Sequence, residues 1–110
     1  MENPFEELAG LDRLVHEPAR LAIMTALSAC KKADFVFLQN LTGLTKGNLS
    51  THLTRLEEAH LIEVDKQFAG KKPVTFVQLS ETGRQAIKQY WVRLEQLRDA
   101  AALWQGEEST

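Results

Sequence analysis

The side chains with the clearest potential for chemistry lie between residues 45 and 58, where small polar residues are interspersed with leucines. Leu49, Leu53 and Leu56 recur at spacings of four and three, which predicts a helix with one apolar face. The opposite face is small and polar and carries Gly47, Asn48, Thr51, Thr54, Arg55 and Glu58, with Ser50 and His52 on its flanks. Gly, Asn, Ser and Thr are weaker helix formers than Ala, Glu or Lys. An ordinary exposed helix would not need so many of them, so their number favours a face that contacts a partner. The alternative, a face that is only solvated, stays open from this helix alone.

Side chains of these types can read the edges of DNA bases. Asn48 can pair with an adenine edge, Thr51 can touch a thymine methyl group or a base-edge acceptor, and Arg55 can reach guanine or phosphate. Gly47 would let the two backbones approach, and the start of the helix offers amides and positive charge to phosphate. The candidate DNA-binding residues of this stretch are Thr45, Lys46, Gly47, Asn48, Ser50, Thr51 and Arg55.

No comparable sequence pattern indicates metal binding or catalysis. Cys30, His16, His52 and His60 are too scattered along the chain for the spacing of a metal site. The sequence has no Gly-rich phosphate loop, no nucleophile elbow and no His-Glu-x-x-His motif. We therefore expect no metal, no cofactor and no enzymatic activity. Two lysines beside Cys30 would suit a redox sensor, but a small hydrophobe or a loop residue is the preferred interpretation.

Two consecutive helices are predicted to position the polar face. Asp34 is a good N-cap for a short helix over residues 35–41, and Gly43 can end that helix in a left-handed conformation. Thr45 then caps the leucine-bearing helix, which runs over residues 46–59. A short helix, a tight turn and a second helix form a helix-turn-helix unit.

Two further helices are predicted before this unit. Asn3 and Pro4 form a helix start signal, and the apolar spacing after them predicts a helix over residues 4–15, although Gly10 weakens it. A second start signal at Pro18 predicts a helix over residues 18–29. This second helix is apolar around much of its circumference, so we expect it to be central and buried. Arg20 at its start could contact phosphate or pair with an acidic neighbour, and both roles stay open.

A β-hairpin is predicted after the leucine-bearing helix. Residues 61–68 and 74–79 contain β-branched side chains in partial alternation, which favours two strands joined by a turn. Lys66, Lys71 and Lys72 would place positive charge on this hairpin, where it could neutralise DNA phosphates. Lysines at a hairpin tip also serve solubility, and that alternative stays open.

The final helix carries an apolar seam. Ser80 is its predicted N-cap, and five apolar residues follow at spacings of four, three, four and three: Tyr90, Leu94, Leu97, Ala101 and Trp104. The seam could dock against the first helix of its own chain, which we prefer for Ile87 and Tyr90, or it could meet a second copy. A large apolar end with nothing to cover it usually marks a partner. We expect a homodimer interface formed by Phe5, Leu8, Tyr90, Leu94, Leu97, Ala101 and Trp104.

Composition is compatible with a small soluble DNA-binding protein. The net charge of −2 argues mildly against nucleic acid, but residues 31–79 carry seven basic and five acidic side chains. The excess positive charge therefore lies where the DNA-reading elements are predicted. The acidic start does not look like a secretory signal, and no apolar stretch is long enough for a membrane span. One cysteine fits a reducing compartment, so the cytoplasm is expected.

Three stretches of the chain together match one family. They are His16-Glu-Pro-Ala-Arg-Leu-Ala-Ile, Leu44-Thr-Lys-Gly-Asn-Leu-Ser-Thr-His-Leu-Thr-Arg-Leu-Glu-Glu-Ala-His-Leu-Ile and Leu79-Ser-Glu-Thr-Gly-Arg. They resemble the MarR/ArsR-like winged helix regulators, and the resemblance spans roughly residues 11–98. It implies a homodimer whose recognition helices enter adjacent major grooves of double-stranded DNA, with the wings on flanking phosphates or in a minor groove. His60 stands where the family usually has glycine, so the helix would end in a strained left-handed residue.

The sequence thus predicts a mainly α fold with a small β-hairpin (α+β) in a single domain over residues 1–110. Residues 11–79 would form the helix-turn-helix core and wing, and residues 80–106 a dimerisation helix. We expect a sequence-specific transcriptional regulator. Repression is preferred over activation, because a bare DNA-binding dimer can block polymerase without further surfaces.

Two other interpretations stay open. A winged helix can serve as a protein-interaction module, and acidic residues near the reading helix favour that alternative: Glu57, Glu58, Glu63 and Asp65. A regulator gated by an unknown small-molecule effector is the other. The chain contains no dedicated sensor domain, so such an effector would lie between the dimer helices and the DNA-binding core.

Overall fold

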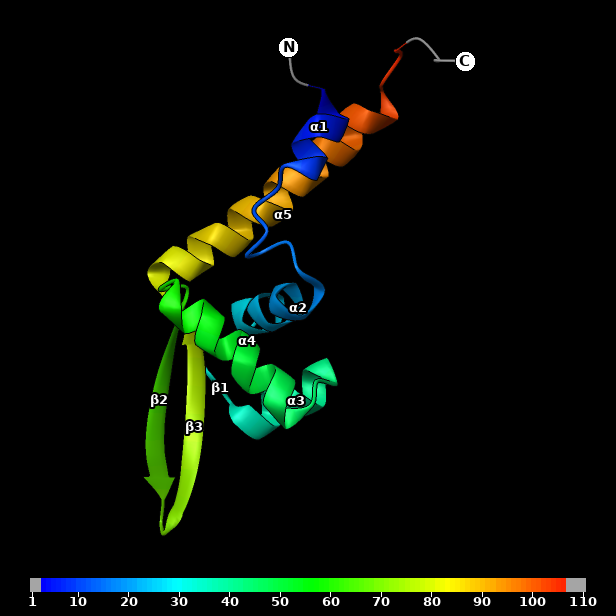
Figure 1. The fold of residues 1–110 in the computed structure, drawn as a ribbon. Coiled ribbons are helices and arrows are strands. Elements are labelled where there is room, and N and C mark those ends of the chain that lie inside the picture. Colours follow the sequence, from blue (N-terminus) through cyan, green and yellow to red (C-terminus); the bar gives the residue numbers. More distant parts are fainter. Residues whose placement is uncertain (1–2, 107–110) are drawn as a thin grey trace.

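The computed structural model describes residues 3–106 as five helices and a small three-stranded antiparallel sheet (Figure 1). In chain order the elements are α1 (Pro4–Ala9), α2 (Pro18–Ser28), β1 (Ala33–Asp34), α3 (Phe35–Thr42), α4 (Lys46–Glu58), β2 (Ile62–Ala69), β3 (Lys72–Leu79) and α5 (Glu81–Ala102). This mainly helical architecture with a β-hairpin and a long last helix is the one that the sequence predicts. Within the described range, no helix combines the length and the apolar composition that crossing a bilayer requires.

Local signals fix the helix-turn-helix unit. Asp34 Oδ1 accepts a hydrogen bond from the Phe37 amide at 2.8 Å, and Thr45 Oγ1 accepts one from the Asn48 amide at 3.1 Å. Gly43 lies between the two helices at φ 73°, the left-handed conformation that ends α3. The predicted caps and turn are confirmed. They could be predicted because each depends only on residues close together in the sequence.

The first helix is shorter than the sequence predicts. α1 ends at Ala9, whereas the apolar spacing predicts a helix over residues 4–15. The Gly10 amide closes the last turn, and Asp12 Oδ1 then accepts a hydrogen bond from the Leu14 amide at 3.0 Å. This local turn competes with helical hydrogen bonding. The prediction of one continuous helix is therefore wrong, and the chain turns before α2 begins.

The hairpin of β2 and β3 is longer and tighter than predicted. Its turn consists of Gly70 and Lys71, and Gly70 adopts φ 68°, which glycine accepts without strain. A short strand that no sequence pattern predicts completes the sheet: β1 pairs with β3, so that the strand order is β1-β3-β2. In this pairing Ala33 lies opposite Val77.

α2 is the centre of the hydrophobic core. Its side chains Ile23, Met24 and Leu27 are fully buried, and the helix packs against α3, α4, α5 and β3. Val77 and Leu79 reach the same core from the base of the hairpin, whereas the far part of the hairpin extends away from the helices (Figure 1). The prediction of a central buried helix is confirmed. This core fixes α4 and the hairpin relative to each other.

A second and smaller packing unit lies at the far end of α5. We call it the arm, and it consists of α1 together with residues 93–106 (Figure 1). The rings of Phe5 and Trp104 meet edge to face with 5.5 Å between centroids, and Arg93 forms an ion pair with Glu7. α5 has 22 residues, which corresponds to roughly 33 Å of helix, and it carries the arm away from the core. The long dimension of the molecule is 66 Å.

Candidate nucleic-acid interface

α4 presents the two faces that its sequence predicts. Leu49, Leu53 and Leu56 are at most 5% exposed and pack into the core. The residues on the opposite side are all exposed: Thr45, Lys46, Gly47, Asn48, Ser50, Thr51, Thr54 and Arg55. The orientation of the helix is therefore confirmed, and the assignment of these side chains to DNA stays a prediction.

Hydroxyl groups on the exposed face are partly used within the helix. Thr51 Oγ1 donates a hydrogen bond to the Gly47 carbonyl at 3.0 Å, and Thr54 Oγ1 donates one to the Ser50 carbonyl at 3.0 Å. With its proton donated to the backbone, the exposed Thr51 hydroxyl oxygen can still accept a hydrogen bond. The contact of Thr51 with a base edge or a thymine methyl group stays a prediction.

A buried arginine connects α4 to the rest of the core. Arg20 on α2 is 8% exposed, and its Nε donates a hydrogen bond to the Leu14 carbonyl at 2.7 Å. Its Nη1 lies 3.2 Å from Nδ1 of His52, a half-buried residue on the flank of α4. Of the two roles considered for Arg20, the structure supports the structural one, because its guanidinium is directed inward. The contact with His52 thus joins the start of α2 to one flank of α4.

Glu17 completes this partly buried cluster. Its carboxylate caps α2 by accepting a hydrogen bond from the Arg20 amide at 2.8 Å. Burial by itself would raise the pKa of Glu17, but hydrogen bonds from the Arg20 and Ala19 amides and Coulombic interactions with His52 and Arg20 outweigh it. The net effect lowers the pKa of this carboxyl below its usual value.

Strand register sorts the charges of the hairpin onto two faces. The side chains of a strand alternate between the faces, and paired residues share one face. The pairs on the face toward α4 are Ile62–Leu79, Val64–Val77, Lys66–Thr75 and Phe68–Pro73. The outer face carries Glu63–Gln78, Asp65–Phe76, Gln67–Val74 and, at the end of the hairpin, Ala69–Lys72. The two acidic side chains of β2 therefore point away from α4, and Lys66 is on the side of α4.

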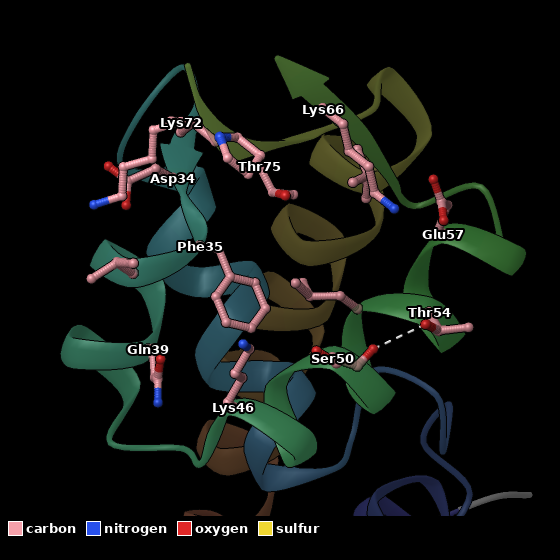
Figure 2. A pocket seen from close by; sticks show the side chains of 15 residues that line it. Asp34, Phe35, Gln39, Lys46, Ser50, Thr54, Glu57, Lys66, Lys72 and Thr75 are labelled. Atoms are coloured by element: carbon pink, nitrogen blue, oxygen red, sulfur yellow. Dashed lines mark hydrogen bonds between the residues drawn. The ribbon is translucent and has the colours of Figure 1, made fainter. Parts of the chain in front are cut away.

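A groove separates α4 and α3 from the hairpin, and its volume is about 760 Å³. Phe35, Leu53 and Val64 give it an apolar floor, and lysines from three elements stand around it: Lys46, Lys66 and Lys72 (Figure 2). Asp34 and Glu57 also line the groove, so its rim is mixed in charge with basic residues in excess.

The predicted DNA-binding residues are not all placed at this groove, and five of them are exposed on α4 or at its start, outside the groove lining: Thr45, Gly47, Asn48, Thr51 and Arg55. Lys46 and Ser50 of α4 and Lys72 of β3 line it directly. Lys71 is farther out, in the exposed turn at the tip of the hairpin. Sequence patterns missed Phe35 and Gln39, which belong to α3 but line the groove opposite the hairpin. No local signal marks them, because their position depends on how α3 packs beside α4.

The residues expected at a dimer interface are not equally available. Tyr90 and Leu97 are buried within the single chain, and Tyr90 is part of the main core, as preferred from the sequence. Its hydroxyl lies 2.6 Å from His16 Nδ1, and burial raises its pKa. The half-buried members are Leu8, Leu94 and Ala101. Phe5 and Trp104 remain about half exposed at the end of the arm, beside Leu103 at 79%.

Metal and redox sites can be assessed on the described residues. Between residues 3 and 106, no group of three or more His, Cys, Asp and Glu side chains comes close enough to hold a metal ion. Cys30 is half-buried just after α2, where its Sγ donates a hydrogen bond to the Ala26 carbonyl at 3.4 Å.

Comparisons with known proteins agree with this geometry. Residues 19–98 match the family model described as "Winged helix DNA-binding domain". The structure of a transcriptional regulator homologue from Pyrococcus horikoshii OT3 is 30% identical in sequence and superposes with a TM-score of 0.79, covering 87% of this chain and 94% of that one. The resemblance inferred from the sequence is therefore confirmed.

Two less similar structures share the fold. A MarR-like transcription regulator from Bacillus cereus is 17% identical with a TM-score of 0.66, over 93% of this chain and 77% of that one. The transcriptional repressor CouR, solved bound to a 23-mer DNA duplex, is 15% identical with a TM-score of 0.67, over 86% of this chain and 71% of that one.

Proposed function

This chain belongs to the family of winged helix DNA-binding domains, and from that premise we propose that it is a homodimeric transcriptional repressor. The observation that carries the proposal is the exposed polar face of α4, which lies beside a groove surrounded by lysines. The structure of CouR on DNA supports this function, since that repressor has the same fold. Catalysis forms no part of the proposal.

In the proposed complex, α4 enters the major groove and the hairpin acts as the wing. A major groove of about 12 Å admits a helix, and the small side chains of Gly47, Asn48 and Thr51 would let α4 approach the bases closely. Lys46 and Lys72 would hold the phosphates on either side of the protein groove. Lys71 at the tip would reach a flanking phosphate.

The dimer is proposed from the arm. Exposed apolar side chains gather there, with Leu103 at 79%, Trp104 at 49% and Phe5 at 48% exposure. A second copy of the chain would cover them, and α5 would set the distance between the two copies of α4. Such a dimer binds a pseudo-palindromic operator whose half-sites are about one helical turn apart.

The protein-interaction alternative is less well supported than the sequence alone suggested. Glu63 and Asp65 lie on the outer face of the sheet, away from α4, so they do not repel DNA at the reading surface. Glu57 lines the groove and Glu58 is exposed at the end of α4, so some negative charge remains there. A small-molecule effector between the arm and the core stays a prediction.

Selection of bound duplexes from a random pool, followed by titration at several salt concentrations, tests the proposal. We expect a pseudo-palindromic site with salt-dependent affinity. Asn48→Ala should relax preference at one base position at a cost of about 1–3 kcal/mol. Lys71→Ala should instead weaken binding to all duplexes and reduce the salt slope by about 1. Lys88→Ala, an exposed lysine of α5, is the matched control and should change neither quantity.

Two outcomes would contradict the proposal. Failure of the pool to yield any duplex with salt-dependent binding would favour the protein-interaction module. If Lys71→Ala left affinity and salt slope at the values of the Lys88→Ala control, the wing would not contact DNA.

A further inference from the structure

The tip of the wing carries an aromatic side chain that the fold does not use. Phe68 is 75% exposed, which makes it the most exposed aromatic residue in the described part of the chain. It lies on β2 next to the last residue of the strand and pairs with Pro73 on β3. The two apolar side chains thus form a cross-strand pair just before the turn, beyond the reach of the hydrophobic core.

Strand register places this pair on the face that is directed toward α4. Phe68 shares its face with Val64 and Ile62, which descend to the core, and not with Glu63 and Asp65. The same face is the one that bounds the groove beside α4, and Pro73 is one of the groove-lining residues. If α4 contacts DNA, Phe68 is therefore on the side of the wing that faces the duplex.

Positive charge surrounds the apolar pair. Lys66 precedes Phe68 by two residues on the same face, a separation of roughly 7 Å along a strand. Lys71 follows in the turn, and Lys72 begins β3, where its pairing with Ala69 places it on the opposite face of the hairpin. An apolar tip flanked by cations fits a DNA minor groove, where phosphates line both edges and an apolar side chain can insert between two base steps.

We propose that Phe68, backed by Pro73, is a wedge that enters the minor groove beside the α4 contact and partly unstacks one base step. Apolar side chains that enter a minor groove in this way kink the duplex toward the major groove. The cost of unstacking is lowest at flexible pyrimidine–purine steps, so the wedge would add sequence preference at a position that receives no hydrogen bond. The kink would also bend the duplex along the wing, where Lys71 and Lys72 can hold its phosphates. This inference rests on the proposed DNA-binding function and adds a specificity-determining residue to it.

The test uses the full-length protein and a duplex selected by it, with the fluorescent adenine analogue 2-aminopurine at each flanking position in turn. A dye pair at the duplex ends reports bending. We expect the wild type to raise the 2-aminopurine signal at one flanking step and to shorten the end-to-end distance. Phe68→Ala should lose both signals and bind roughly tenfold more weakly. Phe68→Leu, which retains an apolar wedge, should keep most of both.

Controls separate the wedge from the function on which it rests. Phe37→Ala removes another exposed aromatic residue, on α3, and should leave unstacking and bending unchanged. Lys71→Ala should weaken binding but keep the unstacking signal at saturation. If the wild type binds duplex in a salt-dependent manner and Phe68→Ala shows the same affinity, unstacking and bending, the wedge is overturned while DNA binding stands. Absence of wild-type binding to any duplex would overturn both.

The oligomeric state of the Phe68→Ala variant also tests the proposal. Light scattering of wild-type and Phe68→Ala proteins without DNA should give the same mass. Were Phe68→Ala to dissociate an oligomer, the side chain would be covered by a second copy of the chain and the wedge would be overturned.

Discussion

The body and the arm of this molecule are packed in different ways. In the body, which comprises α2, α3, α4, the sheet and the start of α5, leucines from three helices are fully buried against one another's elements: Leu27, Leu38, Leu49 and Leu56. In the described part of the arm, Leu97 alone is buried, and the aromatic rings of Phe5 and Trp104 touch each other while half of each stays exposed.

This difference indicates which region completes its packing within one chain and which leaves apolar surface for a partner. The body closes its own core within one chain, so substitutions there should change the free energy of unfolding. The arm leaves apolar surface uncovered, so substitutions there should change association, if the proposed dimer forms. Four substitutions test the contrast.

The largest effect is expected where α5 enters the body. Gly83 lies in the first turn of α5, and a Cβ at this position would stand 1.9 Å from the Leu61 carbonyl oxygen. That atom belongs to the backbone and accepts a hydrogen bond from the Ser80 amide, so it cannot move aside alone. Gly83→Ala should lower the free energy of unfolding by about 3 kcal/mol or more. Urea unfolding measures this, with Thr82→Ala at the adjacent exposed position as the control; equal stability of the two variants would contradict it.

The next effect is expected in the arm. Leu103 is 79% exposed, so a charge there should cost the single chain little. In the proposed homodimer, Leu103→Glu would place that charge against apolar surface and raise the dissociation constant at least about tenfold. Sedimentation equilibrium measures it, and Leu41→Ala, which changes an exposed leucine of α3, is the control. A wild type that is monomeric at micromolar concentration would contradict the dimer itself.

A smaller, pH-dependent effect is expected for Glu17 in the body. Its pKa is lowered in the folded protein, so the carboxylate contributes stability above its ordinary pKa, and this contribution is lost as the pH falls through the lowered value. Glu17→Gln should therefore cost about 1 kcal/mol near neutral pH and progressively less under acidic conditions. Urea unfolding across that range measures the difference. Glu58→Gln, at an exposed carboxylate of α4, should show no such convergence with the wild type.

Sequence patterns predicted the structure correctly where it depends on neighbours along the chain. The inward leucines of α4, the caps at Asp34 and Thr45, and the left-handed Gly43 are all local features. His60, which stands in place of the family's glycine, adopts φ 61°, so the left-handed exit from α4 is retained despite its cost.

The same patterns failed where the outcome depends on tertiary contacts. β1 has two residues, and only pairing with β3 makes it a strand. Leu97 belongs to the apolar seam whether that seam packs within the chain or against a second copy. The structure shows that Leu97 is buried within its own chain, in which α1 packs against α5. The acidic residues of β2 counted against DNA binding until strand register placed them on the outer face.

The smallest effect in stability is expected at Gly47, which differs from Gly83 because a Cβ added there would meet nothing within 4 Å. Gly47 is exposed in the first turn of α4, so Gly47→Ala should raise the free energy of unfolding by up to about 1 kcal/mol through helix propensity. The same methyl group would stand between α4 and the duplex, so DNA affinity should fall while stability rises. Urea unfolding and DNA titration of the one variant measure both. A stabilised protein with unchanged affinity would mean that the duplex does not approach α4 at this residue, and the proposed docking of its first turn would have to be abandoned.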